Sequence, residues 1–158
     1  SMLCAGLDAN ALRWGPVVPE GSLGWAMLAL VRPDAGNGVG SGEIDSFHGD
    51  DKSEDKRKTR FLIAGLAGLN RLPVDKAADM ARQYDFQLDR PSRWSILIDK
   101  AAEVGNPTLV ALLAGAGLQG KGWERMTARN LYHIVSALNR VGMSAEARMI
   151  AAEAVARG

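Results

Sequence analysis

The chain has 158 residues but only one cysteine, Cys4, and two histidines, His48 and His133. A lone cysteine excludes an internal disulfide bond and a cysteine-rich zinc site. The two histidines lie far apart in sequence, and the acidic residues around His48 match the spacing of neither an EF-hand loop nor a zinc motif. The sequence therefore predicts no metal site and no cofactor.

An excess of charge of one sign is missing as well. The 19 lysines and arginines nearly balance the 18 aspartates and glutamates, so no net field draws the molecule onto nucleic acid. The longest charge-free stretch, residues 104–120, contains a proline and several glycines and is too short to span a bilayer. We expect a soluble protein without a nucleic-acid partner. No secretion signal is visible, which leaves the compartment open between cytoplasm and periplasm.

Motifs of common enzyme classes do not occur either. The sequence has no GxSxG nucleophile elbow, no HExxH helix and no GxxxxGK[ST] phosphate loop. Its carboxylates are spread over predicted helix flanks and connectors, and no pair stands out as an acid and a base. His133 is interpreted as a residue on a helix flank rather than as a general base. No catalytic residue is therefore predicted.

Strand signals are scarce, because no stretch alternates apolar and polar residues and alanine and leucine far outnumber β-branched residues. Helix signals recur instead. A short helix is predicted from Asp8 or Asn10 to Trp14, and Ser22 precedes a second helix whose apolar residues follow a helical period. Further capping residues and glycine stops predict about seven to nine helices, which defines an all-α fold.

Residues 34–52 interrupt this pattern. They are rich in Gly, Asp and Ser, and their few apolar residues show no period. Structureless segments of about 20 residues are uncommon inside compact domains and are usually functional or disordered. We therefore predict a flexible loop at about 34–52 within a single domain of residues 1–158. The opening Ser1-Met2 leaves open whether the chain is a piece of a longer, bacterial protein.

From Ser53 onward the predicted helices come in pairs separated by very short turns, which favour antiparallel hairpins. These hairpins stack as a short α-solenoid or as an irregular bundle. Gly65 and Gly68 each cost a helix about 1 kcal/mol relative to alanine, and so predict a surface on which another helix packs closely. The pairs are 53–70 with 73–84, 92–104 with a helix capped by Asn106, and 127–141 with a helix capped by Ser144.

An internal match supports the pairing. A shift of 69 positions lays Leu69-Asn70-Arg71 on Leu138-Asn139-Arg140 and Arg60 on Arg129, and it predicts both hairpin turns at the same point. In this arrangement residues 53–158 resemble the helical-hairpin repeat class, the tetratricopeptide and Sel1-like α-solenoids, without their full consensus or even spacing. The resemblance implies a stacked all-α scaffold and transfers no site.

Trp123 follows a connector rich in glycine and is the best candidate for an exposed aromatic anchor, with core packing as the alternative. The helix face around Arg129 and Tyr132 completes the candidate binding site, and Lys56–Lys58 and Arg60 are candidates for contact with an acidic partner. These features favour a noncatalytic interaction module that binds a protein or peptide. Two alternatives stay open: an enzyme or accessory domain of a cell-envelope enzyme, and a structural oligomerisation domain.

Overall fold

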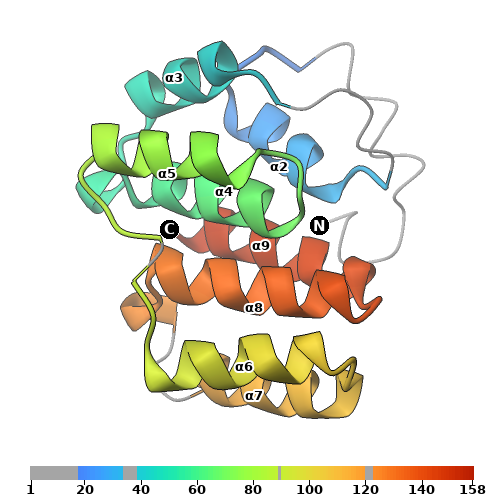
Figure 1. Cartoon of the computed structure of the whole chain (residues 1–158). Helices are drawn as coiled ribbons and strands as arrows, with labels where there is room; N and C mark the ends of the chain where they lie inside the picture. The colour runs from blue at the N-terminus through green and yellow to red at the C-terminus, as the bar shows by residue number, and fades with distance from the viewer. Residues whose placement is uncertain (1–17, 34–38, 89, 120–122) are drawn as a thin grey trace.

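The computed structural model describes residues 18–33, 39–88, 90–119 and 123–158. These residues form eight α-helices and no strand, which confirms the all-α prediction (Figure 1). The helix predicted between Asp8 and Trp14 lies outside the described residues. The elements are α2 (Leu23–Val31), α3 (Ser41–Asp50), α4 (Arg57–Gly68), α5 (Val74–Gln83), α6 (Arg93–Glu103), α7 (Pro107–Gln119), α8 (Ala128–Arg140) and α9 (Ser144–Arg157), with the 3-10 turns η3 (Glu54–Lys56) and η4 (Trp123–Arg125).

The three predicted pairs are present as α4–α5, α6–α7 and α8–α9. Each turn contains a residue with left-handed backbone geometry: Asn70 (φ 58°), Gly105 (φ 67°) and Gly142 (φ 84°). In each turn, the backbone amide of the next residue donates a hydrogen bond to a carbonyl of the preceding helix. This arrangement satisfies the last carbonyls of the helix and turns the chain sharply into the next one.

The hairpins do not pack in the order of the chain. α8 packs against both α4 and α6, so the third hairpin contributes the helix that lies between the first and second hairpins (Figure 1). A solenoid places successive hairpins side by side, so the observed order is that of an irregular bundle. The internal match is also imperfect: Gly68, where α4 ends, corresponds to Ala137, but α8 continues to Arg140, and the two turns do not coincide.

α4 is the central helix of the bundle. All residues from 61 to 69 are buried, because α2, α8 and α9 pack around this helix and α5 covers a further part. A Cβ added at Gly65 would lie 3.0 Å from both Ala151 Cβ and Leu30 Cδ2, and one added at Gly68 would lie 2.8 Å from Val135 Cγ1. The prediction that these glycines permit close helix packing is therefore confirmed.

Residues 41–50 form α3, so the prediction of a structureless loop over 34–52 is wrong for this part. Ile44 and Phe47, one helical turn apart, are buried and hold α3 against α4. The pattern was missed because these two residues are the only large apolar ones in a helix that also contains Gly42 and Gly49. Residues 34–38 lie outside the described residues.

α4 begins at Arg57, later than the predicted start at Ser53, and two side chains cap it. The Ser53 hydroxyl accepts a hydrogen bond from the amide of Lys58 at 3.0 Å. The buried Asp51 carboxylate accepts from the amide of Thr59 at 2.8 Å and from its hydroxyl at 2.7 Å. These acceptors satisfy first-turn amides that would otherwise lack partners.

The other predicted caps are confirmed with one exception. Ser22 and Asn106 each accept from an amide in the first turn of their helix. Ser92, predicted only as the start of a helix, also acts as a cap. Ser144 does not cap α9: it is the first residue of that helix, and its hydroxyl donates to Asn139 Oδ1 at 2.8 Å.

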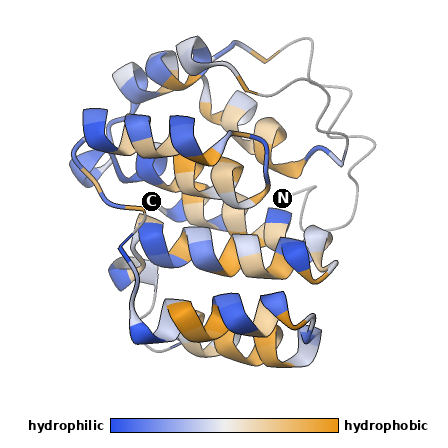
Figure 2. Cartoon of the chain, viewed as in Figure 1, coloured by the Kyte–Doolittle hydropathy of each residue, from blue (hydrophilic) through white to orange (hydrophobic). Residues whose placement is uncertain are grey.

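The α6–α7 hairpin is rich in hydrophobic residues (Figure 2), and several of them are exposed. Leu112 is 66% exposed and Val104 is 74% exposed, and Ile96 and Leu97 are about half exposed. α7 has no charged residue along its whole length. None of the helices in the described part of the chain has the length and apolar character needed to cross a membrane.

Gly68→Ala is expected to lower the free energy of unfolding by about 1–3 kcal/mol, because the added Cβ overlaps Val135 and lies 3.0 Å from the Ser136 amide nitrogen. Gly115→Ala is the matched control: nothing lies within 4 Å of its added Cβ, so alanine should raise stability by about 0.5–1 kcal/mol. Urea unfolding measures both. If both substitutions raised the free energy of unfolding equally, α4 and α8 would not approach each other as closely as described.

The stabilisation provided by Asp51 is expected to depend on pH. Burial raises the pKa of Asp51, but the hydrogen bonds from Ser53 and Thr59 outweigh burial and lower the pKa below its ordinary value of 3.8. A carboxylate whose pKa is lowered by folding stabilises the protein above its unfolded-state pKa, and this stabilisation is lost as the pH falls through the folded-state pKa.

Asp51→Ala should therefore lower the free energy of unfolding by about 1–3 kcal/mol near pH 7. Below about pH 4, the free energies of unfolding of the variant and of wild type should become more similar. Urea unfolding at a series of pH values tests this expectation. Asp50→Ala, at an exposed neighbouring carboxylate, is the control and should change stability by less than about 0.5 kcal/mol. A difference for Asp51→Ala that persists unchanged into acid would contradict the role of its charge.

Candidate functional site

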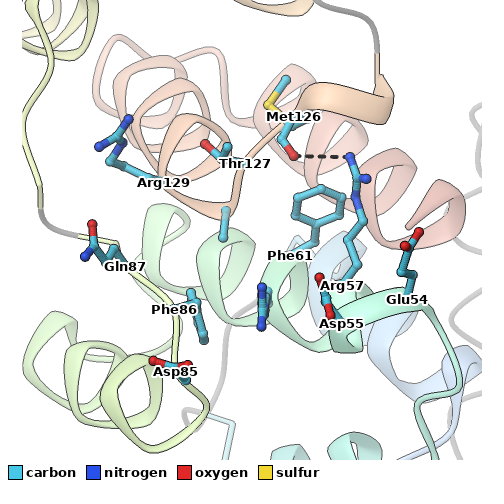
Figure 3. A pocket seen from close by; sticks show the side chains of 12 residues that line it. Glu54, Asp55, Arg57, Phe61, Asp85, Phe86, Gln87, Met126, Thr127 and Arg129 are labelled. Atoms are coloured by element: carbon cyan, nitrogen blue, oxygen red, sulfur yellow. Dashed lines mark hydrogen bonds between the residues drawn. The ribbon is translucent and has the colours of Figure 1, made fainter.

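A cleft of about 440 Å³ opens where α4 and α8 begin side by side (Figure 3). Its third wall is the segment that follows α5. The lining residues are Glu54, Asp55, Arg57, Arg60, Phe61, Asp85, Phe86, Gln87, Met126, Thr127, Ala128 and Arg129. Two helices start here, and their first-turn amides are already capped: those of α4 by Asp51 and Ser53, and that of Asn130 in α8 by Thr127.

Arg60 on α4 and Arg129 on α8 face this cleft with incomplete hydrogen bonding. The Nε atom of each is buried and has no hydrogen-bond partner among the described residues. Neither guanidinium forms a salt bridge with a described carboxylate. A buried donor without a partner costs about 1–3 kcal/mol, so the hydrogen bonding of both arginines is incomplete within the described residues.

Arg57, the third arginine of the cleft, holds the cleft wall together. Its guanidinium donates to the carbonyl of Trp123 and, at 3.1 Å, to that of Met126. It also lies over the Phe61 ring, 5.0 Å from the ring centroid. These contacts tie η4 and the start of α8 to the first turn of α4, and so fix the distance across the cleft.

The cleft carries acidic and aromatic groups beside its arginines. Glu54, Asp55 and Asp85 are exposed at its rim, so the lining contains three acidic and three basic side chains. Phe86 is half-buried, and the Arg60 guanidinium lies 5.9 Å from the centroid of its ring. The site therefore combines arginines near the helix starts, an aromatic surface and an acidic rim.

The three residues predicted to bind a partner do not face one space. Arg129 lines the cleft. The half-buried Trp123 packs against the core, with Arg157 of α9 5.7 Å from its ring centroid. Tyr132 is half-buried toward α6: burial raises its pKa, and Asp99 on α6 adds to the effect. Of the basic residues predicted to touch an acidic partner, Arg57 and Arg60 line the cleft with Arg129.

Sequence reasoning missed Phe86 and the acidic rim. Phe86 and Asp85 follow α5 in an irregular segment where no periodicity places them, and Asp85 adopts a left-handed φ of 54°. One signal for the arginine pair was present, because the internal match aligns Arg60 with Arg129. This alignment related one position on each helix, but it did not show that both residues line the same cleft.

Both histidines lie against other side chains of the fold. His133 is buried, so its assignment to a helix flank is wrong: its Nδ1 lies 2.9 Å from Asp99 Oδ2 of α6. His48 stacks on the Tyr84 ring at 4.0 Å, and the Tyr84 hydroxyl donates to Asp45. The described residues hold no group of three or more His, Cys, Asp or Glu side chains arranged to bind a metal ion.

Comparisons with known proteins add no relative to this picture. No family model, no curated protein and no solved structure matches the chain.

Trp123→Ala is expected to lower the free energy of unfolding by about 1–3 kcal/mol, less than for a fully buried tryptophan, because the ring is half-buried under Arg157. Thermal or urea unfolding measures the loss. Trp123→Phe keeps an aromatic ring in this position and should lose less than Trp123→Ala. Wild-type stability in the alanine variant would mean that the ring is free, as required of an exposed anchor.

Proposed function

We propose that this chain is a noncatalytic protein-interaction module that binds an acidic group of a partner protein in the cleft between α4 and α8. The observation that carries the proposal is the pair Arg60 and Arg129, which line one cleft and whose Nε atoms have no hydrogen-bond partner among the described residues. A hydrogen bond to a charged group contributes about 1.5–3 kcal/mol. A carboxylate that binds either guanidinium group would gain this interaction there.

The balance of charge in the cleft supports a protein partner over a polyanion. A nucleic acid places phosphates along the whole binding surface and is bound by a continuous basic groove. Here Glu54, Asp55 and Asp85 stand beside the arginines and would repel neighbouring phosphates. A peptide, which carries isolated charges among uncharged residues, fits this mixed surface.

In this proposal the predicted binding residues have different roles. Arg129 contacts the partner directly, together with Arg60. The backbone carbonyl of Trp123 accepts from Arg57, which helps to hold the wall that carries Met126 and Arg129, while the Trp123 side chain packs against the core.

The double variant Arg60→Gln/Arg129→Gln tests the proposal. An array of short random peptides, each made with a free and with an amidated carboxyl end, is probed with wild type and variant. Peptides bound by wild type should bind the variant at least about tenfold more weakly, because each lost charge-assisted hydrogen bond is worth that factor or more.

Arg93→Gln, at an exposed arginine of α6, is the control and should bind as wild type does. Circular dichroism should show that all variants remain folded, because Arg60 and Arg129 form no salt bridge with a described residue. Equal binding by wild type and the double variant, or no peptide bound by wild type, would refute the proposed function.

A further inference from the structure

The side of α7 that faces away from the bundle carries no charge. Only Val110 and Ala114 of this helix are buried, where α7 packs on α6 and α8. A surface helix of a globular protein normally has charged residues opposite its buried stripe. In α7 the opposite side exposes Leu112 and Ala116 instead. This helix therefore lacks the charged, solvated side that a helix at the surface of a monomer usually has.

Side chains of α6 extend this apolar surface. Trp94 of α6 donates a hydrogen bond to the Leu113 carbonyl of α7 at 3.2 Å, so the side of α6 that carries Trp94 lies beside α7. The helical period places the exposed Leu97 and Val104 close to this side. Asp99 lies on the opposite side of α6, where it contacts α8. Leu97 and Val104 therefore continue the exposed surface of α7 and point away from α8.

These exposed residues form one apolar surface, the outer face of the hairpin, which consists of Leu97, Val104, Leu109, Leu112 and Ala116. Contiguous exposed apolar surfaces mark interaction sites. The exposed charged residues of the hairpin are all on α6 and have both signs: Arg93, Lys100 and Glu103. A strongly charged partner would lose the solvation of its charges on the outer face, whereas a second copy of the same face brings no excess of charge.

The shape of α7 favours a second copy of the same helix as the occupant. Leu112 projects from the outer face and is 66% exposed. One turn further along, nothing lies within 4 Å of a Cβ added at Gly115, and the neighbouring Ala116 has a small side chain. The surface thus has a projection and a hollow side by side. A two-fold axis between them places the projection of each copy in the hollow of the other, which is the self-complementarity that a symmetric dimer requires.

Going beyond the proposed function, we infer that two copies of this chain pair through the outer face, with their α7 helices antiparallel about a two-fold axis. Leu112 of each copy lies over Gly115 and Ala116 of the other copy. Leu97 and Val104 widen the contact from α6. The cleft between α4 and α8 takes no part in this contact, so partner binding and dimerisation use separate surfaces.

The size of the outer face determines how strong this dimer is. The two helices of the hairpin are about 16–20 Å long, and packed helix axes lie about 8–10 Å apart, which gives a footprint of about 400 Å². A standard interface buries about 800 Å² on each partner. The dimer is therefore weak, with a dissociation constant in the micromolar range or above, and its population depends on protein concentration.

Sedimentation velocity of the full chain between about 1 µM and 1 mM tests the inference, because this range brackets a weak dimer. The wild-type mass should rise from that of one chain toward that of two. Leu112→Asp places a charge in the contact and should weaken the dimer at least about tenfold. Met149→Asp, at an exposed apolar residue of α9, is the matched control and should dimerise as wild type does. Circular dichroism checks that both variants remain folded.

The pairing of Leu112 with Gly115 is tested by exchanging projection and hollow. Gly115→Leu fills the hollow and should block the dimer, although the folded monomer has room for the new side chain. Leu112→Ala/Gly115→Leu moves the projection to the other position, so the same two-fold axis again pairs a projection with a hollow. This double variant should dimerise at concentrations at which Gly115→Leu alone stays monomeric. A double variant that also stays monomeric would overturn the two-fold pairing.

Three further outcomes would overturn the dimer itself or its surface. They are a single-chain mass at every concentration, a dimer that Leu112→Asp leaves unchanged, and binding to phosphatidylcholine vesicles that needs Leu112 while the protein stays monomeric, which would assign the outer face to a lipid surface. The variant Arg60→Gln/Arg129→Gln should dimerise as wild type does. Peptide binding and dimerisation therefore fail or succeed independently of each other.

Discussion

The structure depends on the burial of the central helix, α4, from Phe61 onward. Buried residues follow one another from Phe61 to Leu69, so this helix has no side that faces water and must be enclosed by its neighbours. Two of its positions are glycine, because α8 and α9 approach too closely for a side chain. The backbone at its start is satisfied by Asp51 and Ser53, which supply the acceptors that a buried helix end requires.

The candidate site follows from the same constraint. Because the core requires apolar or small residues from Phe61 onward, the charged residues of α4 are confined to its first turn, where Arg57 and Arg60 lie. α8 begins next to this turn and brings Arg129 to the same place. A concentration of cations beside two helix starts is therefore a direct result of how the core is enclosed. Arg57 secures the arrangement by binding the carbonyls of η4.

Local features of the fold were predictable from sequence, and long-range ones were not. The hairpins, most caps and the close packing at Gly65 and Gly68 depend on turn residues and periodic patterns that a single sequence displays. α3 was missed because Ile44 and Phe47 are too few to show a period. The place of α8 between α4 and α6 could not be predicted, because periodicity identifies an apolar face without naming its partner. The cleft was missed for the same reason: it joins Arg60, Phe86 and Arg129 from three separate segments.

The order in which the hairpins pack affects how the protein folds during its synthesis on the ribosome. The surfaces of α4 that α8 and α9 cover have no permanent partner while only the first two hairpins have been synthesised. The apolar surface of α4 therefore stays exposed to chaperones and to other unfolded chains until the third hairpin has been synthesised. A chain released from the ribosome before α9 is made would form its first helices but could not bury their apolar surfaces.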